Sequence, residues 1–168
     1  LGEQLRVKGL VKTLTANFNT EAYGPDGILR VQAELTDAGL AQQDEIIAAV
    51  FAYIDLIKRK GLDKNYYREL QAMRSKDFAS APKPEPLDHA VELTMAQFDF
   101  PIENLLNADY VYERYDVKSI KQVLAQLDEK RVRVWYVNPS EQVDKPIPFF
   151  DGKYALRDIA DEKFQRWN

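Results

Sequence analysis

Two stretches near the start of the chain alternate apolar and polar residues, as strands with one buried face do. The apolar side of the first stretch, residues 10–18, consists of Leu10, Leu14, Ala16 and Phe18. Its opposite side consists of Val11, Thr13, Thr15 and Asn17. The apolar side of the second stretch, residues 28–36, consists of Leu29, Val31, Ala33 and Leu35. With the turn signal Gly24-Pro25-Asp26-Gly27 between them, the pattern predicts two strands of an antiparallel sheet.

The next region has the spacing of an amphipathic helix. After a predicted break at Thr36-Asp37-Ala38-Gly39, residues 42–60 place apolar side chains on one helical face. These are Ile46, Val50, Tyr53, Ile54 and Ile57. Acidic residues near the start and basic residues near the end suit the helix dipole. Gly61 suits the position just after the helix end.

Cap residues predict further helices. Asp63 is placed to cap a helix that ends near residue 78, and Asp116 to cap another that begins at Val117. Between them, Pro86 suits the first turn of a third helix, and Pro101 the start of a short one. A weak helix over residues 1–9 and a short helix over 161–167 complete the helical pattern.

A third strand is predicted at residues 131–137, where β-branched and aromatic residues precede Asn138-Pro139. Strands, then several helices, then a strand predict an α+β fold, with helices packed on one face of a small antiparallel sheet. We expect residues 1–168 to form a single domain fragment, in which 141–168 is an extended connector and the terminal helix.

Composition narrows the class of protein. Of 168 residues, 45% are apolar and 11% aromatic, which is enough for a core. The formal charge of −4 argues against nucleic acid as a partner, and no apolar run approaches the roughly 20 residues of a membrane span. The chain opens with Leu1-Gly2 and has few strands for its helices, so we expect a piece of a longer protein. Unpaired strand edges are then expected to make the isolated chain self-associate.

Candidate catalytic and metal-binding residues are scarce. Cysteine is absent, which removes disulfides, thiolate ligands and cysteine nucleophiles. His89 is the only histidine, whereas a zinc site such as His-x-x-Glu-His needs at least two. We expect His89 to be a surface residue, and Glu69 and Asp77 to belong to a solvated helix face. No catalytic residue and no metal ligand are predicted in this chain.

Short segments along nearly the whole chain carry a family resemblance. They are Lys8-Gly9-Leu10 with the strand to Asn17, Leu35-Thr36-Asp37-Ala38-Gly39-Leu40, Lys58-Arg59-Lys60-Gly61-Leu62-Asp63, Tyr112-Glu113-Arg114-Tyr115-Asp116, Arg131-Val132-Arg133-Val134-Trp135-Tyr136-Val137 with Pro139, and Phe164-Gln165-Arg166-Trp167. In order and spacing they resemble the insulinase–pitrilysin family of zinc metallopeptidases, most closely its bacterial pitrilysin branch. The resemblance implies a fragment of the LuxS/mitochondrial-processing-peptidase-like metallohydrolase fold.

The resemblance also implies a role without catalysis. The matching region is the second of the family's homologous domains, whereas the His-x-x-Glu-His motif lies in the first. Zinc would belong to the parent enzyme, with none bound by this chain. In the insulin-degrading branch, an edge strand of this domain pairs with the peptide substrate. The aligned residues here are Leu14, Thr15, Ala16, Asn17 and Phe18. In that branch glycines stand at the positions of Ala16 and Asn17.

The function expected from the resemblance is therefore the substrate-chamber, peptide-positioning part of a zinc-dependent metalloendopeptidase. Its partners would be peptide substrate and the other domains of the same polypeptide, in the periplasm or outside the cell. An inactive scaffold or binding subunit on the same fold is the alternative. A helical interaction module unrelated to peptidases is a third reading, and the strand-like alternation argues against it.

Overall fold

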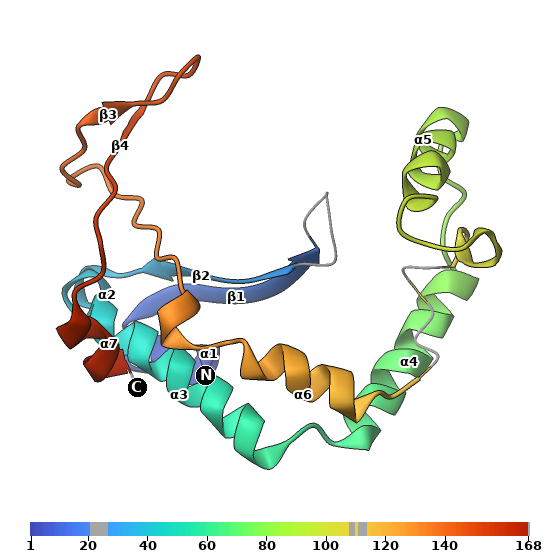
Figure 1. Cartoon of the computed structure of the whole chain (residues 1–168), viewed down its shortest axis with the longest axis horizontal. Helices are drawn as coiled ribbons and strands as arrows, with labels where there is room; N and C mark the ends of the chain where they lie inside the picture. Colours follow the sequence, from blue (N-terminus) through green and yellow to red (C-terminus); the bar gives the residue numbers. More distant parts are fainter. Residues whose placement is uncertain (21–26, 108–109, 111–113, 168) are drawn as a thin grey trace. The chain divides into compact units, whose positions relative to one another are not determined.

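The computed structural model describes residues 1–20, 27–107, 110 and 114–167 (Figure 1). Most of the predicted turn at 24–27, and Tyr112 and Glu113 of the family-like motif, lie outside these residues. The chain divides into two compact units, Leu1–Arg59 with Val123–Asn168, and Lys60–Gln122. The expectation that residues 1–168 form a single domain stays a prediction.

The sheet of the first unit has two strands, β1 (Val11–Thr20) and β2 (Gly27–Leu35), which pair antiparallel. Leu14 lies opposite Ala33, and Ala16 opposite Val31. The predicted apolar positions of the two strands therefore share one face, because successive side chains alternate between the faces of a sheet. Both predicted strands are confirmed.

A bulge changes the start of β1. The register shifts between Val11 and Thr13, where Lys12 is the extra residue. Val11 was predicted on the polar side, and this is wrong: it is buried in the core next to Leu10. The reason is that a bulge offsets the alternation of the residues before it. The exposed Lys12 ammonium lies 2.9 Å from the Glu34 carboxylate.

Helices α1 (Gly2–Val7) and α3 (Gln43–Lys60) pack against this apolar face. The core consists of the buried side chains Leu5, Leu10, Val11 and Ile46, surrounded by Leu1, Leu14, Ala33, Leu35 and Ala49. Helices on one face of a small antiparallel sheet are the predicted fold class, which is confirmed. The C-terminal glycine of α3 is also as predicted, since Gly61 has a positive φ of 72°.

The strand break predicted at residues 36–39 is confirmed, since β2 ends at Leu35, and the same residues begin a short helix that was not predicted, α2 (Asp37–Ala41). The Thr36 hydroxyl oxygen accepts a hydrogen bond from the Gly39 N–H at 3.0 Å and donates to the Gly9 carbonyl at 2.6 Å. A side chain at Gly39 would place its Cβ 1.8 Å from the Leu10 carbonyl oxygen. Thr36 caps the helix, and Gly39 lets the helix approach the main chain at Leu10, just before β1. This approach joins residues distant in sequence, so no local pattern reveals it.

The second unit holds α4 (Lys64–Ala79), α5 (Pro86–Ala96), the 3₁₀ turn η1 (Ile102–Asn104) and the start of α6 (Val117–Ala125). Asp63 caps α4 by accepting from the Asn65 N–H at 2.8 Å, as predicted. Asp116 caps α6 through the Ser119 N–H at 3.1 Å, also as predicted. Pro86 occupies the first turn of α5.

The third strand predicted at 131–137 is wrong. Arg131 ends the 3₁₀ turn η2 (Glu129–Arg131), and residues 132–137 have no ladder partner in the part of the chain that the structure describes. Val132 and Val134 are half-buried while Arg133 and Trp135 are exposed, so the side-chain alternation persists without pairing. The predicted connector contains a small hairpin instead, β3 (Lys145–Pro146) and β4 (Lys153–Tyr154).

Helix α7 (Asp161–Trp167), confirmed where the sequence predicts it, attaches to the first unit through Trp167. That side chain is 2% exposed, and its ring stacks on Phe51 with centroids 6.5 Å apart. Phe164 meets it edge-on at 5.9 Å, and the indole N–H donates to Asp44 at 3.2 Å. One aromatic residue thus joins the last helix to α3.

We expect Trp167→Ala to lower the free energy of unfolding by about 3–5 kcal/mol, because it removes a buried aromatic side chain. The matched control is Trp135→Ala, since Trp135 is 83% exposed and should change stability by less than about 0.5 kcal/mol. Urea unfolding followed by circular dichroism measures both. Equal losses for the two variants would contradict the role of Trp167.

Asp116 predicts a specific acid sensitivity. Hydrogen bonds from the Ser119 backbone and hydroxyl, followed by the nearby Arg114 charge, hold the pKa of Asp116 below its ordinary value. A carboxyl whose pKa is lower in the folded state stabilises the fold above its unfolded pKa, and this contribution is lost as the pH falls through the folded pKa.

We therefore expect Asp116→Asn to lower the melting temperature at neutral pH and to approach the unsubstituted protein as the pH falls through the folded pKa of Asp116. Melting curves over this pH range measure the difference. Asp151→Asn, between β3 and β4, controls for the loss of one charge. A difference that does not shrink with falling pH would contradict the assignment.

Candidate functional site

The predicted peptide-pairing residues all lie on β1, and the structure brings them together as one continuous stretch. Leu14 is half-buried, and the other four residues, Thr15, Ala16, Asn17 and Phe18, are exposed. Within the described residues β1 pairs with β2 alone, so one side of the strand carries main-chain groups with no strand partner (Figure 1). Such groups can accept an added strand.

Helix α1 limits how much of the apolar face of β1 is open. A Cβ built on Gly2 would lie 3.7 Å from the Leu14 Cβ and 3.9 Å from the Leu14 carbonyl oxygen. The start of α1 therefore packs against the strand at Leu14. Beyond this point, residues 15–19 of β1 are exposed. The open length of about five residues at ~3.4 Å each can pair with a short extended peptide.

The two faces of the open stretch differ in chemistry. On one face Ala16 and Phe18 lie opposite the half-buried Val31 and Leu29 of β2. On the other face Thr15 lies opposite Gln32, and Asn17 opposite Arg30. A strand paired here would have one apolar and one polar surface beside it.

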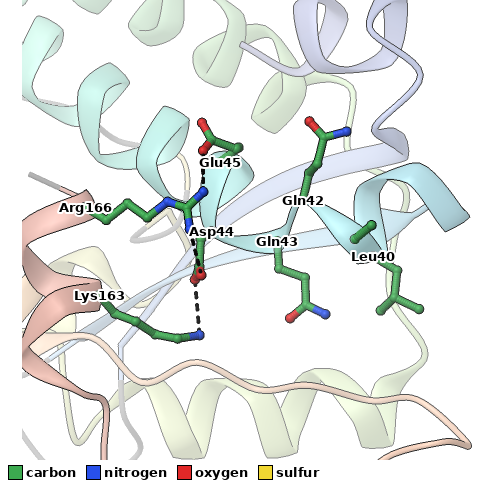
Figure 2. Close-up of a pocket in the computed structure, with 8 residues that line it drawn as sticks. Leu40, Gln42, Gln43, Asp44, Glu45, Lys163 and Arg166 are labelled. Atoms are coloured by element: carbon green, nitrogen blue, oxygen red, sulfur yellow. Dashed lines mark hydrogen bonds and ion pairs between the residues drawn. The ribbon is translucent and has the colours of Figure 1, made fainter.

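A second candidate is a polar pocket of about 240 Å³ between the start of α3 and helix α7 (Figure 2). Its lining residues are Leu40, Ala41, Gln42, Gln43, Asp44, Glu45, Lys163 and Arg166. No sequence pattern singled it out, because the two helices lie more than a hundred residues apart. The sequence shows only that α3 begins with acidic residues and that α7 carries basic residues, which does not predict that the two helices meet.

The charges of this pocket are paired with one another. Lys163 lies 3.2 Å from Asp44, and Arg166 lies 2.7 Å from Glu45 and 3.8 Å from Asp44, as Figure 2 shows. The hydrogen bond to Glu45, followed by the charges of Glu45 and Asp44, raises the pKa of Arg166 above its ordinary value. Two cations balance two carboxylates, so the cluster fastens α7 to α3 and has no charge left over for a ligand.

The side chains that the structure describes do not form a zinc site. His89 is half-buried near the start of α5, and the described residues contain no group of three or more His, Asp or Glu side chains that could hold a metal ion. A catalytic zinc needs three protein ligands and an open position. Glu69 and Asp77, on α4, are exposed. Among the described helices, none has the length and apolar character to cross a membrane.

Comparisons with known proteins confirm the family resemblance. Residues 78–168 match a family model described as the middle or third domain of peptidase M16. The chain is 34% identical over 167 residues to Protease 3 of Escherichia coli (strain K12), which is 99% of this chain and 17% of that protein. It is 26% identical over 174 aligned positions to a nardilysin-like protein of Arabidopsis thaliana, covering 98% of this chain and 16% of that protein.

A solved structure extends the likeness to the fold. The crystal structure of pitrilysin matches with a TM-score of 0.90 at 34% identity, over 99% of this chain and 18% of that one. The chain thus spans less than a fifth of the length of these relatives. Because the family model matches more than half of the chain and the identity exceeds 30% over nearly all of it, the chain belongs to the M16 peptidase family, that of insulinase and pitrilysin.

Proposed function

We propose that this chain is a non-catalytic, peptide-positioning part of a zinc-dependent metalloendopeptidase, and that it forms part of the substrate chamber as the second of the enzyme's homologous domains. The unpaired side of β1 carries the proposal. The residues that would bind the peptide are Leu14, Thr15, Ala16, Asn17 and Phe18. Membership of a peptidase family supports an enzyme as the parent.

Pairing with β1 would hold a peptide by β-augmentation. The main-chain N–H and C=O groups of residues 15–19 would exchange hydrogen bonds with an extended peptide, and side chains on both faces would adjust its affinity. This mode makes few sequence demands, which suits an enzyme that acts on varied peptides. Hydrolysis itself would take place on zinc held by residues outside this chain, since the described side chains hold no zinc site.

The proposed partners are peptide substrate and the other domains of the same polypeptide. The proposed location is the periplasm or the cell exterior, by resemblance to the bacterial branch of the family. Self-association of the isolated chain through a sheet edge is expected, because β1 and β2 each have a side with no strand partner in the described structure. A scaffold subunit on the same fold is the alternative, and a parent gene that encodes no His-x-x-Glu-His motif would favour it.

The isolated chain is expected to cleave no peptide when zinc is supplied. A quenched fluorescent peptide, assayed with and without a chelator, measures this, with E. coli Protease 3 as the positive control. Chelator-sensitive cleavage that remains with the chain through purification would contradict a non-catalytic role.

Peptide binding by β1 is tested with N-methylated peptides. Methylating alternate nitrogens gives two sets, of which only one blocks hydrogen bonds to the strand. We expect that set to weaken binding at least about tenfold, because two or three bonds of roughly 1 kcal/mol each are lost. The other set should bind within about twofold of the parent peptide, since its methyl groups point away from the strand.

Amide chemical shifts separate the two strand edges. We expect the largest shifts that peptide induces to lie in residues 15–19 of β1, with smaller shifts in residues 28–32 of β2. Equal weakening by both methylated sets, or shifts confined to β2, would show that pairing on β1 is not the binding mode.

A further inference from the structure

The apolar face of the open β1 stretch has a gap at Ala16. Its small side chain lies between the larger Leu14 and Phe18 and opposite the half-buried Val31. Phe18 does not fill this gap. A Cβ built on Gly27 would lie 2.3 Å from the Phe18 Cζ, so the Phe18 ring leans across β2 towards Gly27 and away from the unpaired side.

A peptide strand on β1 would place a side chain directly beside Ala16. Neighbouring strands lie about 4.8 Å apart, and side chains of directly opposed residues are in contact on the same face. A large apolar side chain at this position can lie over the Ala16 methyl group and reach Val31. An alanine or a polar side chain there would leave Ala16 and Val31 exposed to water.

The next residue of the peptide would lie on the other face, beside Asn17. There Thr15 and Asn17 are short and uncharged, while Arg30, opposite Asn17, is exposed and has no ion pair among the described residues. Lys12, the other cation of this face, is already bound to Glu34. Among the described side chains at the open end of the polar face, Arg30 is thus a positive charge without an ion pair, and it complements a carboxylate.

We propose that Ala16 and Arg30 select the peptide that pairs with β1: an extended segment with a large apolar side chain beside Ala16 and an acidic side chain at the adjacent position, beside Asn17. This inference rests on the proposed pairing with β1 and adds a substrate class to it. The apolar gap sets the register of the peptide, and Arg30 supplies a weaker, salt-dependent preference.

Host peptides that differ at one guest position test the gap. We expect leucine or phenylalanine beside Ala16 to bind about fivefold more tightly than alanine, the effect of a good cross-strand apolar pair. Ala16→Leu fills the gap and should remove this preference while the alanine peptide still binds. The matched control, Ala52→Leu at an exposed position of α3, should leave the preference unchanged.

A second peptide series tests Arg30 by comparing aspartate with asparagine at the peptide position beside Asn17. We expect aspartate to bind about twofold more tightly at low salt, and the difference to vanish in Arg30→Gln or at ~1 M salt. Circular dichroism checks that each variant folds, and the guest series on the unsubstituted protein tests the gap even if Ala16→Leu is unstable.

The outcomes distinguish the two levels of the proposal. Equal affinity for every guest, with N-methyl sensitivity retained, would overturn the selection by Ala16 and Arg30 and leave pairing with β1 in place. Binding of no peptide at all would overturn the proposed function itself. An affinity that follows peptide hydrophobicity at any position, without dependence on register, would also overturn the selection.

Discussion

The packing of α1 and α3 on one face of the β1–β2 sheet is the interaction on which the first unit depends. A two-stranded sheet is marginal in water unless its apolar face is covered. Leu5 of α1 and Ile46 of α3 supply this cover, and they meet Leu10 and Val11 at the start of β1. The two helices cover β1 as far as Leu14, and residues 15–19 stay exposed. The buried start of the strand therefore holds its exposed end in place.

This arrangement supports the proposed binding of a peptide to β1. A binding edge needs a fixed backbone, which the core provides, and unpaired main-chain groups, which only an uncovered strand can offer. The same α1 that completes the core also approaches the strand at Leu14 and so defines where the open stretch begins. Under the proposed function, the near half of β1 would serve stability and the far half would bind the peptide.

Helix α7 adds a second point of attachment in the same unit. Its aromatic and charged residues contact Phe51, Asp44 and Glu45 of α3. These contacts join two helices that are far apart in the sequence. The polar pocket beside it is hollow like a binding site, but each of its charged side chains is already paired with another side chain of the pocket. Charge balance, more than shape, distinguishes this structural cluster from the open strand.

The sequence by itself determined the local elements, because their causes are local. Strand alternation, the caps at Asp63 and Asp116, and the glycine after α3 depend on residues within a few positions, and each is confirmed. It also carried the family resemblance, which depends on the order of short segments. The absence of a second histidine already excluded a histidine-based zinc site.

Tertiary structure decided the rest, since each remaining feature depends on a neighbour distant in sequence. Val11 is buried because a bulge shifts its register, and α2 forms because Gly39 can approach Leu10. Residues 132–137 have strand-like alternation, yet a strand requires a hydrogen-bonded partner, and the described residues supply none. The open side of β1 is of the same kind: the sequence determined its side chains, and pairing with β2 alone among the described residues leaves the main-chain groups on its other side without a strand partner.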